Sequence, residues 1–142
     1  MKTIVTSWAL VLAWMGLIFY FSHQPGDRSG EMSSGVLQAL TALLPFEPSE
    51  TFHFLLRKSA HFTVYAVLGI LLLRALKLHA SGKKAVAWAL LISCLYAVSD
   101  EYHQTFIPGR SGEVGDVLID TVGAGSGILV YIGVRRLLKR QN

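Results

Sequence analysis

The sequence is short of charge. Only 15% of its 142 residues are Asp, Glu, Lys or Arg, whereas 52% are hydrophobic, and the mean hydropathy is +0.46. A water-soluble domain carries roughly 25% charged residues because its surface must be solvated. The composition therefore argues against an ordinary soluble enzyme and against a disordered chain. The single cysteine, Cys94, excludes an intrachain disulfide framework and any cysteine-rich zinc site.

In place of charge, the chain has long apolar stretches. A bilayer span needs about 20 apolar residues, and we expect four spans, at about residues 4–21, 60–78, 83–102 and 114–138. A cleaved signal peptide is an alternative for the first stretch, but its Phe-Ser-His end is not a small-x-small cleavage site. We therefore predict an all-α integral membrane protein whose four transmembrane helices form a single domain, 1–142.

The loop between the first two spans, residues 22–57, has apolar residues at helical spacing. They are Val36, Leu37, Leu40, Leu43 and Leu44. Polar residues lie between them, a pattern that is typical of a short amphipathic helix at the membrane surface. A helix packed on its own bundle fits the pattern equally well. We expect a short amphipathic interfacial helix in this first outer loop.

Basic residues are unevenly distributed among the predicted loops. Nine of the thirteen Lys and Arg residues lie on the side that holds both termini, and the other four lie on the opposite side with all nine acidic residues. The two sides carry +9 and −5, which agrees with the net charge of +4. The positive-inside rule then places both termini in the cytoplasm. Because topology accounts for the basicity, we expect no nucleic-acid partner.

Most reactive side chains gather at the outer ends of the predicted helices. Ionisable groups at membrane depth are costly and usually face the interior of a bundle, which makes them candidates for a functional site. The expected cluster draws on all four spans and their loops: Ser22, His23, Gln24, Arg57, Lys58, His61, Tyr65, Asp100, Glu101, His103, Gln104, Arg110, Asp116 and Asp120. A purely structural ion network is the competing interpretation.

The last predicted span carries a continuous stripe of Asp116, Asp120, Gly123, Gly127 and Tyr131. The two glycines form a G-x-x-x-G pair, which allows another helix to approach closely. We therefore expect both aspartates at a seam between helices and not in lipid.

Two stretches carry specific motifs. Residues 58–69 read K-x-x-H-F-x-x-Y-x-x-L-G, while residues 100–104 read D-E-x-H-Q and residues 108–116 read P-G-R-x-G-x-x-x-D. This series resembles the VanZ-like membrane protein family, and the Phe-Ser-His-Gln end of the first span is similar to the family's looser first block. One departure is Val64, where the family commonly has an acidic residue.

The resemblance implies a protein of the bacterial inner (cytoplasmic) membrane, and one member of the family is linked to low-level teicoplanin resistance. Two functions remain open. In the first, a non-enzymatic factor binds the anionic group of a membrane lipid or a lipid-linked envelope precursor and changes glycopeptide susceptibility. Arg110 lies in a glycine-flanked turn that suits a diphosphate, although a salt bridge to Asp116 explains it equally well. The expected binding residues are Arg110, Lys58, Arg57, Gln104, Asp116, Asp120, Tyr65, Ser22 and Gln24.

The second function is an outer-face hydrolase or transferase that acts on a polyprenyl diphosphate or a similar lipid. In it His103 is the base, Asp100 orients it from the i−3 position, and Arg110 holds the anion. The expected catalytic residues are His103, Asp100, Glu101 and His61. No G-x-S-x-G nucleophile motif is present, so the sequence does not decide between binding and catalysis.

A metal is an alternative that the residues leave open. His61, His103 and two of the nearby carboxylates offer nitrogen and oxygen ligands that suit zinc or manganese. The sequence has no H-E-x-x-H motif, and these ligands would come from three helices at no diagnostic spacing. We therefore expect no cofactor and no metal ligands, with a divalent metal as the alternative.

Overall fold

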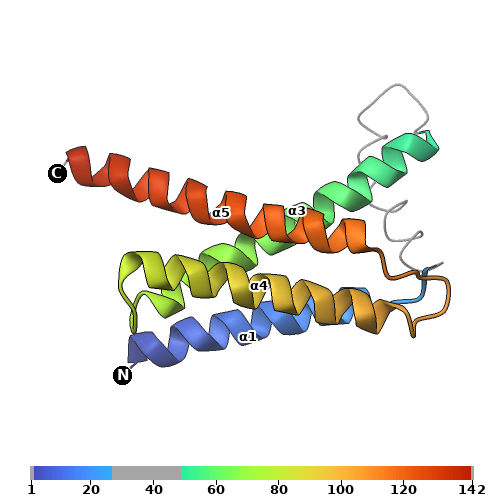
Figure 1. Ribbon diagram of the computed structural model, residues 1–142, viewed down its shortest axis with the longest axis horizontal. Helices are drawn as coiled ribbons and strands as arrows, with labels where there is room; N and C mark the ends of the chain where they lie inside the picture. Colours follow the sequence, from blue (N-terminus) through green and yellow to red (C-terminus); the bar gives the residue numbers. More distant parts are fainter. Residues whose placement is uncertain (1, 27–48, 142) are drawn as a thin grey trace.

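The computed structural model describes residues 2–26 and 49–141. This part of the chain contains no strand and consists of α1 (Lys2–Ser22), α3 (Glu50–Leu76), α4 (Gly82–Gln104) and α5 (Val114–Gln141) (Figure 1). All four helices are long and apolar enough to cross a membrane. The predicted all-α architecture with four spans is therefore confirmed. The expected amphipathic helix falls within residues 27–48, outside the described residues.

Helix α3 begins about ten residues earlier than the sequence pattern indicates. Its N-cap is Ser49, which has an extended backbone and accepts a hydrogen bond from the Phe52 N–H at 3.3 Å. Capping of this kind satisfies a backbone donor that has no partner within the helix. From their charge, Arg57 and Lys58 are expected in a loop. A charged residue does not end a helix, however, where the helix extends out of the apolar layer of the membrane. Both residues therefore lie on α3.

The tightest helix contact joins α3 to α5. A methyl group added at Gly123 would collide with the backbone carbonyl of Phe62, and one added at Gly127 would collide with that of Ala66. The G-x-x-x-G pair thus lies at a helix seam, as its spacing predicts. The seam continues into an apolar core that includes Leu68, Leu72, Leu73 and Ile128.

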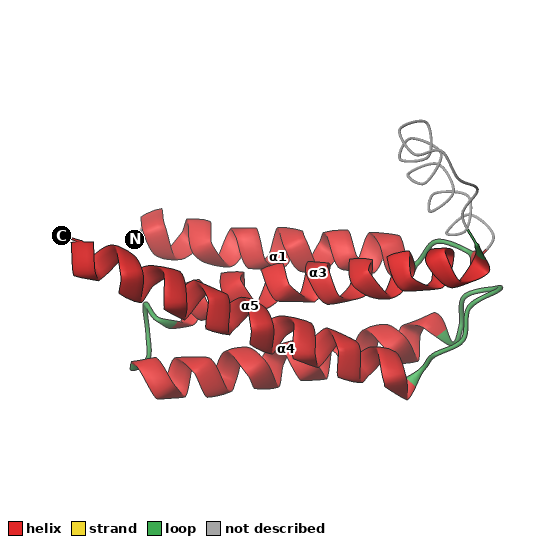
Figure 2. Ribbon diagram, turned by 90° about the horizontal axis from the view of Figure 1, so that it is seen from above, coloured by secondary structure: helices red, strands yellow, loops and turns green. Residues whose placement is uncertain are grey.

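The four helices run along one long axis, as the second view shows (Figure 2). Both described termini and the α3–α4 turn lie at one end, and the α4–α5 loop lies at the other (Figure 1). The first end, here called the basic end, collects Lys2, Arg74, Lys77, Lys83, Lys84, Arg135, Arg136, Lys139 and Arg140. The opposite end, here called the acidic end, holds Asp100, Glu101, Glu113, Asp116 and Asp120. Charge therefore separates along the bundle axis.

Candidate polar site at the acidic end

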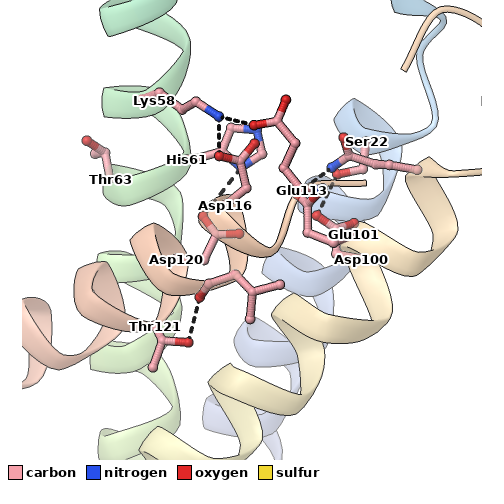
Figure 3. Close-up of polar contacts among 12 residues, drawn as sticks. Ser22, Lys58, His61, Thr63, Asp100, Glu101, Glu113, Asp116, Asp120 and Thr121 are labelled. Atoms are coloured by element: carbon pink, nitrogen blue, oxygen red, sulfur yellow. Dashed lines mark hydrogen bonds and ion pairs between the residues drawn. The ribbon is translucent and has the colours of Figure 1, made fainter. Parts of the chain in front are cut away.

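An ion pair between α3 and α5 lies at the centre of the acidic end. Lys58 Nζ donates to Asp116 Oδ1 and, at 2.9 Å, to Glu113 Oε2 (Figure 3). The Asp116 side chain is fully buried, whereas that of Glu113 is 46% exposed. Lys58 therefore pairs with a carboxylate that water does not reach, in a region where an isolated charge is costly.

One turn further along the same helices, His61 faces Asp120. The distance from His61 Nδ1 to Asp120 Oδ1 is 3.4 Å, which is an ion-pair distance, yet neither oxygen of Asp120 has a hydrogen bond from any described residue. Asp120 is fully buried. Both aspartates thus lie at the α3–α5 seam, as their place on the glycine stripe predicts, because the glycines next along α5 bring the two helices close together.

Helix α4 contributes two buried carboxylates. Glu101 accepts a hydrogen bond from the backbone N–H of Glu113 at 2.9 Å and another from Gln104 Nε2 at 3.2 Å. Asp100 Oδ2 accepts a hydrogen bond from Ser22 Oγ at 2.8 Å, which ties α4 to the end of α1. The other Asp100 oxygen is buried and has no partner. These contacts bring all four helices to the same site.

Arg110 links the loop between α4 and α5 to the end of α1, and the sequence does not indicate this role. Its guanidinium donates to the backbone carbonyls of Gln24 at 2.8 Å and Phe21 at 2.9 Å, and to Gln104 Oε1 at 3.2 Å. Burial lowers the pKa of Arg110 below its ordinary value, and the neighbouring charge of Arg57 lowers it further. The sequence left open a salt bridge from Arg110 to Asp116, and this is wrong, because Lys58 reaches Asp116 from the facing helix.

His103 forms a pair with His23 and not with Asp100. His103 Nε2 lies 3.1 Å from His23 Nδ1, and the two rings are stacked with centroids 5.3 Å apart. The Asp100–His103 hydrogen bond expected from the i, i+3 spacing is not formed among the described residues. Helical spacing makes the two side chains neighbours, but His103 is paired with His23, and Asp100 Oδ2 accepts from Ser22 of α1.

The remaining predicted residues lie around this cluster. Arg57 forms no ion pair in the described part of the chain, and its buried Nε has no hydrogen-bond partner. Tyr65 is fully buried, one turn beyond His61, with its ring 6.3 Å from that of Tyr96. The side chain of Gln24 donates to the Tyr20 carbonyl at 3.1 Å. Arg57 therefore has one buried donor, its Nε, that no described residue accepts from.

Three potential metal ligands converge within the cluster. One ligand atom each from His61, Glu101 and Asp116 lies within 4.8 Å of the other two. This set differs from the one considered from the sequence, which combined His61 with His103. Helix rotation explains the difference, because His103 faces α1 and is paired there with His23.

Comparison with known proteins agrees with this architecture. The model of the VanZ/LLP1 family matches residues 7–138, which include α3, α4, most of α1 and α5, and every residue of the cluster. The chain belongs to the VanZ/LLP1 family. No match was found among curated proteins or among solved structures.

Sequence reasoning missed one member of the cluster in this VanZ/LLP1 protein. Glu113 accepts from Lys58, and the hydrogen bond holds the pKa of its carboxyl below the usual 4.5. Its backbone carbonyl accepts from the Asp116 N–H at 2.9 Å, and its own N–H donates to Glu101. An acidic residue just before a helix N-terminus is favoured by the helix dipole, and that position was the signal available in the sequence.

The balance of charge decides what the arrangement can do chemically. Among the described residues, the carboxylates of Asp100, Glu101, Asp116 and Asp120 are buried, and Lys58 and His61 are the cationic partners that pair with any of them. The interior of this VanZ/LLP1 site thus holds more carboxylates than cationic side chains that pair with them. Arg57, next to Lys58 on α3, forms no ion pair in the described part of the chain.

Proposed function

We propose that this VanZ/LLP1 protein lies in the bacterial inner membrane and binds the anionic head of a membrane lipid or lipid-linked envelope precursor at its acidic end. Binding there changes the susceptibility of the cell to teicoplanin-type glycopeptides. The family's link to teicoplanin resistance supports the biological setting. The chemistry is supported by the cationic edge of the polar cluster.

The proposed orientation places the basic end in the cytoplasm. Nine Lys and Arg residues at that end, with no acidic residue among the described residues there, support it through the positive-inside rule. Reporter fusions after Asn142 and within residues 28–50 test this orientation. A fusion at the C-terminus should be active only as a cytoplasmic reporter, and an exported C-terminus would contradict the proposal.

The observation that carries the binding function is the buried Nε of Arg57, which has no hydrogen-bond partner among the described residues. A buried donor without a partner costs about 1–3 kcal/mol, and its Nε is such a donor. A phosphate oxygen would supply the missing acceptor, and arginine binds phosphate through two parallel hydrogen bonds. Arg57 lies next to Lys58 and close enough to Arg110 for its charge to lower the pKa of that residue. Three cationic side chains are therefore near one another at this edge, and Arg57 is the one of them with no ion pair or hydrogen bond at its Nε among the described residues.

Anion binding is better supported than the catalytic hypothesis in which His103 acts as the base. That catalytic hypothesis needs Asp100 to orient His103 and Arg110 to hold an anion. Asp100 is instead bonded to Ser22, and Arg110 is bonded to two backbone carbonyls. Recognition by Arg57 requires no rearrangement of these contacts.

A susceptibility assay in a teicoplanin-sensitive host tests the proposal. The wild type should raise the inhibitory concentration of teicoplanin, and Arg57→Gln should abolish the increase. Arg57→Lys keeps the charge but loses the bidentate geometry, so it should retain only part of the effect. Arg74→Gln is the matched control, because Arg74 is an exposed arginine on the same helix at the basic end.

Three results would overturn this function. An Arg57→Gln variant that is inserted in the membrane and protects as well as the wild type would remove the recognition role. Loss of protection in His103→Gln alone, with Arg57→Gln unaffected, would favour the enzyme. A wild type that gives no protection would contradict the link to glycopeptides.

A further inference from the structure

We propose that His61, Glu101 and Asp116 bind one divalent transition-metal ion, Zn²⁺ or Mn²⁺, inside the acidic end of the bundle. One nitrogen and two carboxylate oxygens form a ligand set that these metals accept. The three side chains come from α3, α4 and α5, and their ligand atoms lie within 4.8 Å of one another (Figure 3). Metal bonds of about 2.1 Å keep two donors no more than about 4.2 Å apart, so shifts of under about 1 Å close the site.

Buried carboxylate oxygens without partners in the described part of the chain suit a bound cation. Asp116 Oδ2 has no hydrogen bond there, because Lys58 reaches only Oδ1 of this carboxylate. Both oxygens of Asp120 also lack hydrogen bonds from the described residues, and both aspartates are fully buried. Buried polar atoms are nearly always paired, and unpaired buried charge is costly. A cation bound at Asp116 Oδ2 supplies the partner that the described residues do not.

Each proposed ligand already has the kind of outer partner that metal sites use. A ligating imidazole commonly donates its second N–H to a carboxylate, which fixes its orientation. Asp120 Oδ1 lies 3.4 Å from His61 Nδ1, at an ion-pair distance and without a hydrogen bond between them, so a small shift on metal binding would let Nδ1 donate to Asp120 and leave Nε2 for the metal. Lys58 holds the other oxygen of Asp116. Glu101 is held by Gln104 and by a backbone N–H.

Charge also favours an ion at this position. Two carboxylate ligands balance a divalent cation, and Lys58 remains as the partner of Asp116 Oδ1. Three protein ligands leave a further coordination position open, as in metal sites that bind water or a substrate oxygen. The inference does not depend on the proposed function, because a metal site can exist whether or not Arg57 binds a lipid head.

Metal binding to the purified, tag-free full chain in detergent provides the test. After treatment with EDTA, the protein is titrated with Zn²⁺ for elemental analysis and with Co²⁺ for its visible absorption. We expect close to one ion per chain and a melting temperature that rises with metal concentration, because only the folded state holds the three ligands together. His61→Gln and Glu101→Gln should weaken binding by at least about 100-fold, and Asp120→Asn by about 10- to 100-fold.

Two matched variants separate this site from its surroundings. Asp100→Asn changes a buried carboxylate one residue from Glu101, and His103→Gln with His23→Gln removes the neighbouring histidine pair. Both variants should bind the metal as the wild type does. Loss of binding in the double histidine variant would overturn the assignment, because it would place the ion on the histidine pair.

Metal binding to the wild type alone tests the proposal, whether or not the variants fold. If neither Zn²⁺ nor Mn²⁺ at micromolar concentration raises its melting temperature or remains bound after gel filtration, the proposal is wrong. A failed susceptibility assay would leave this result unchanged, so the two proposals fail separately.

Discussion

Replacing Lys58 with Met tests whether the buried charges at the acidic end depend on pairing between helices. Methionine keeps most of the apolar length of the side chain but removes the ammonium that donates to Asp116. Asp116 is fully buried and its second oxygen already has no partner. The Lys58→Met variant would therefore leave a carboxylate at membrane depth with no hydrogen bond from the protein.

The expected loss follows from the burial of the two partners. Removing one partner of a buried ion pair typically costs about 3–5 kcal/mol, because the remaining charge stays desolvated. The Lys58 side chain is 13% exposed, so we expect the lower part of this range, about 3 kcal/mol. Glu113 also loses its partner, but it is 46% exposed and water can replace the lysine, which adds less than about 1 kcal/mol.

Unfolding of the protein in detergent micelles, followed by circular dichroism, measures this loss. The decisive comparison is Lys58→Met with the double variant Lys58→Met/Asp116→Asn, which removes both charges and should recover about 2 kcal/mol of the lost stability. Lys84→Met is the control, since Lys84 is exposed at the basic end and its loss should change stability by less than about 0.5 kcal/mol. The reasoning is refuted if Lys58→Met costs under about 1 kcal/mol, or if the double variant is no more stable than the single one.

Three other perturbations probe the same architecture. Gly127→Ala places a methyl group against the backbone of α3 and should lower the stability of the protein by about 2 kcal/mol or more. In Gly133→Ala the added methyl group meets open space, and this variant should stabilise the helix by about 0.5–1 kcal/mol. Equal melting temperatures for the two variants would contradict the close seam. Arg110→Lys should lose about 2 kcal/mol, because lysine cannot donate to both backbone carbonyls at the end of α1, and hydrogen exchange of residues 21–26 should accelerate; unchanged exchange would contradict this. The lowered pKa of Glu113 means that its ionised form stabilises the fold above the unfolded-state pKa, and that this contribution disappears as the pH falls through the lowered value. The stability difference between wild type and Glu113→Gln should therefore shrink from about pH 6 to about pH 3, and a difference that grows on acidification would be the wrong sign.

The features that could be predicted from the sequence are those encoded within one helix. Apolar length alone indicates four spans, and the four-residue spacing of Asp116, Asp120 and the glycines places one face of α5 against a neighbour. These properties depend on local periodicity, which a single segment reveals. The start of α3 is harder to predict, because its N-cap Ser49 lies well before the apolar stretch, from about residue 60, that marks the span.

The features that could not be predicted are those that need the relative position of two helices. Spacing on α4 makes Asp100 and His103 neighbours, yet their partners are Ser22 and His23 from the end of α1. Arg110 similarly bonds to carbonyls on the far side of its loop. Which side chains come into contact depends on the axial offset and rotation of the helices. Packing and loop length set both of these quantities.

The glycine seam and the buried charges are two parts of one arrangement. Helices α3 and α5 both run from the acidic end to the basic end (Figure 1). The residues that face each other therefore occur in the same order along both helices. Lys58 faces Asp116, His61 faces Asp120, and the backbone of α3 then lies against Gly123 and Gly127. Because glycine permits the closest approach of two helices, the side chains of the polar pairs can meet without water between them. The distance at which the charged pairs form is therefore set by the glycines that follow them.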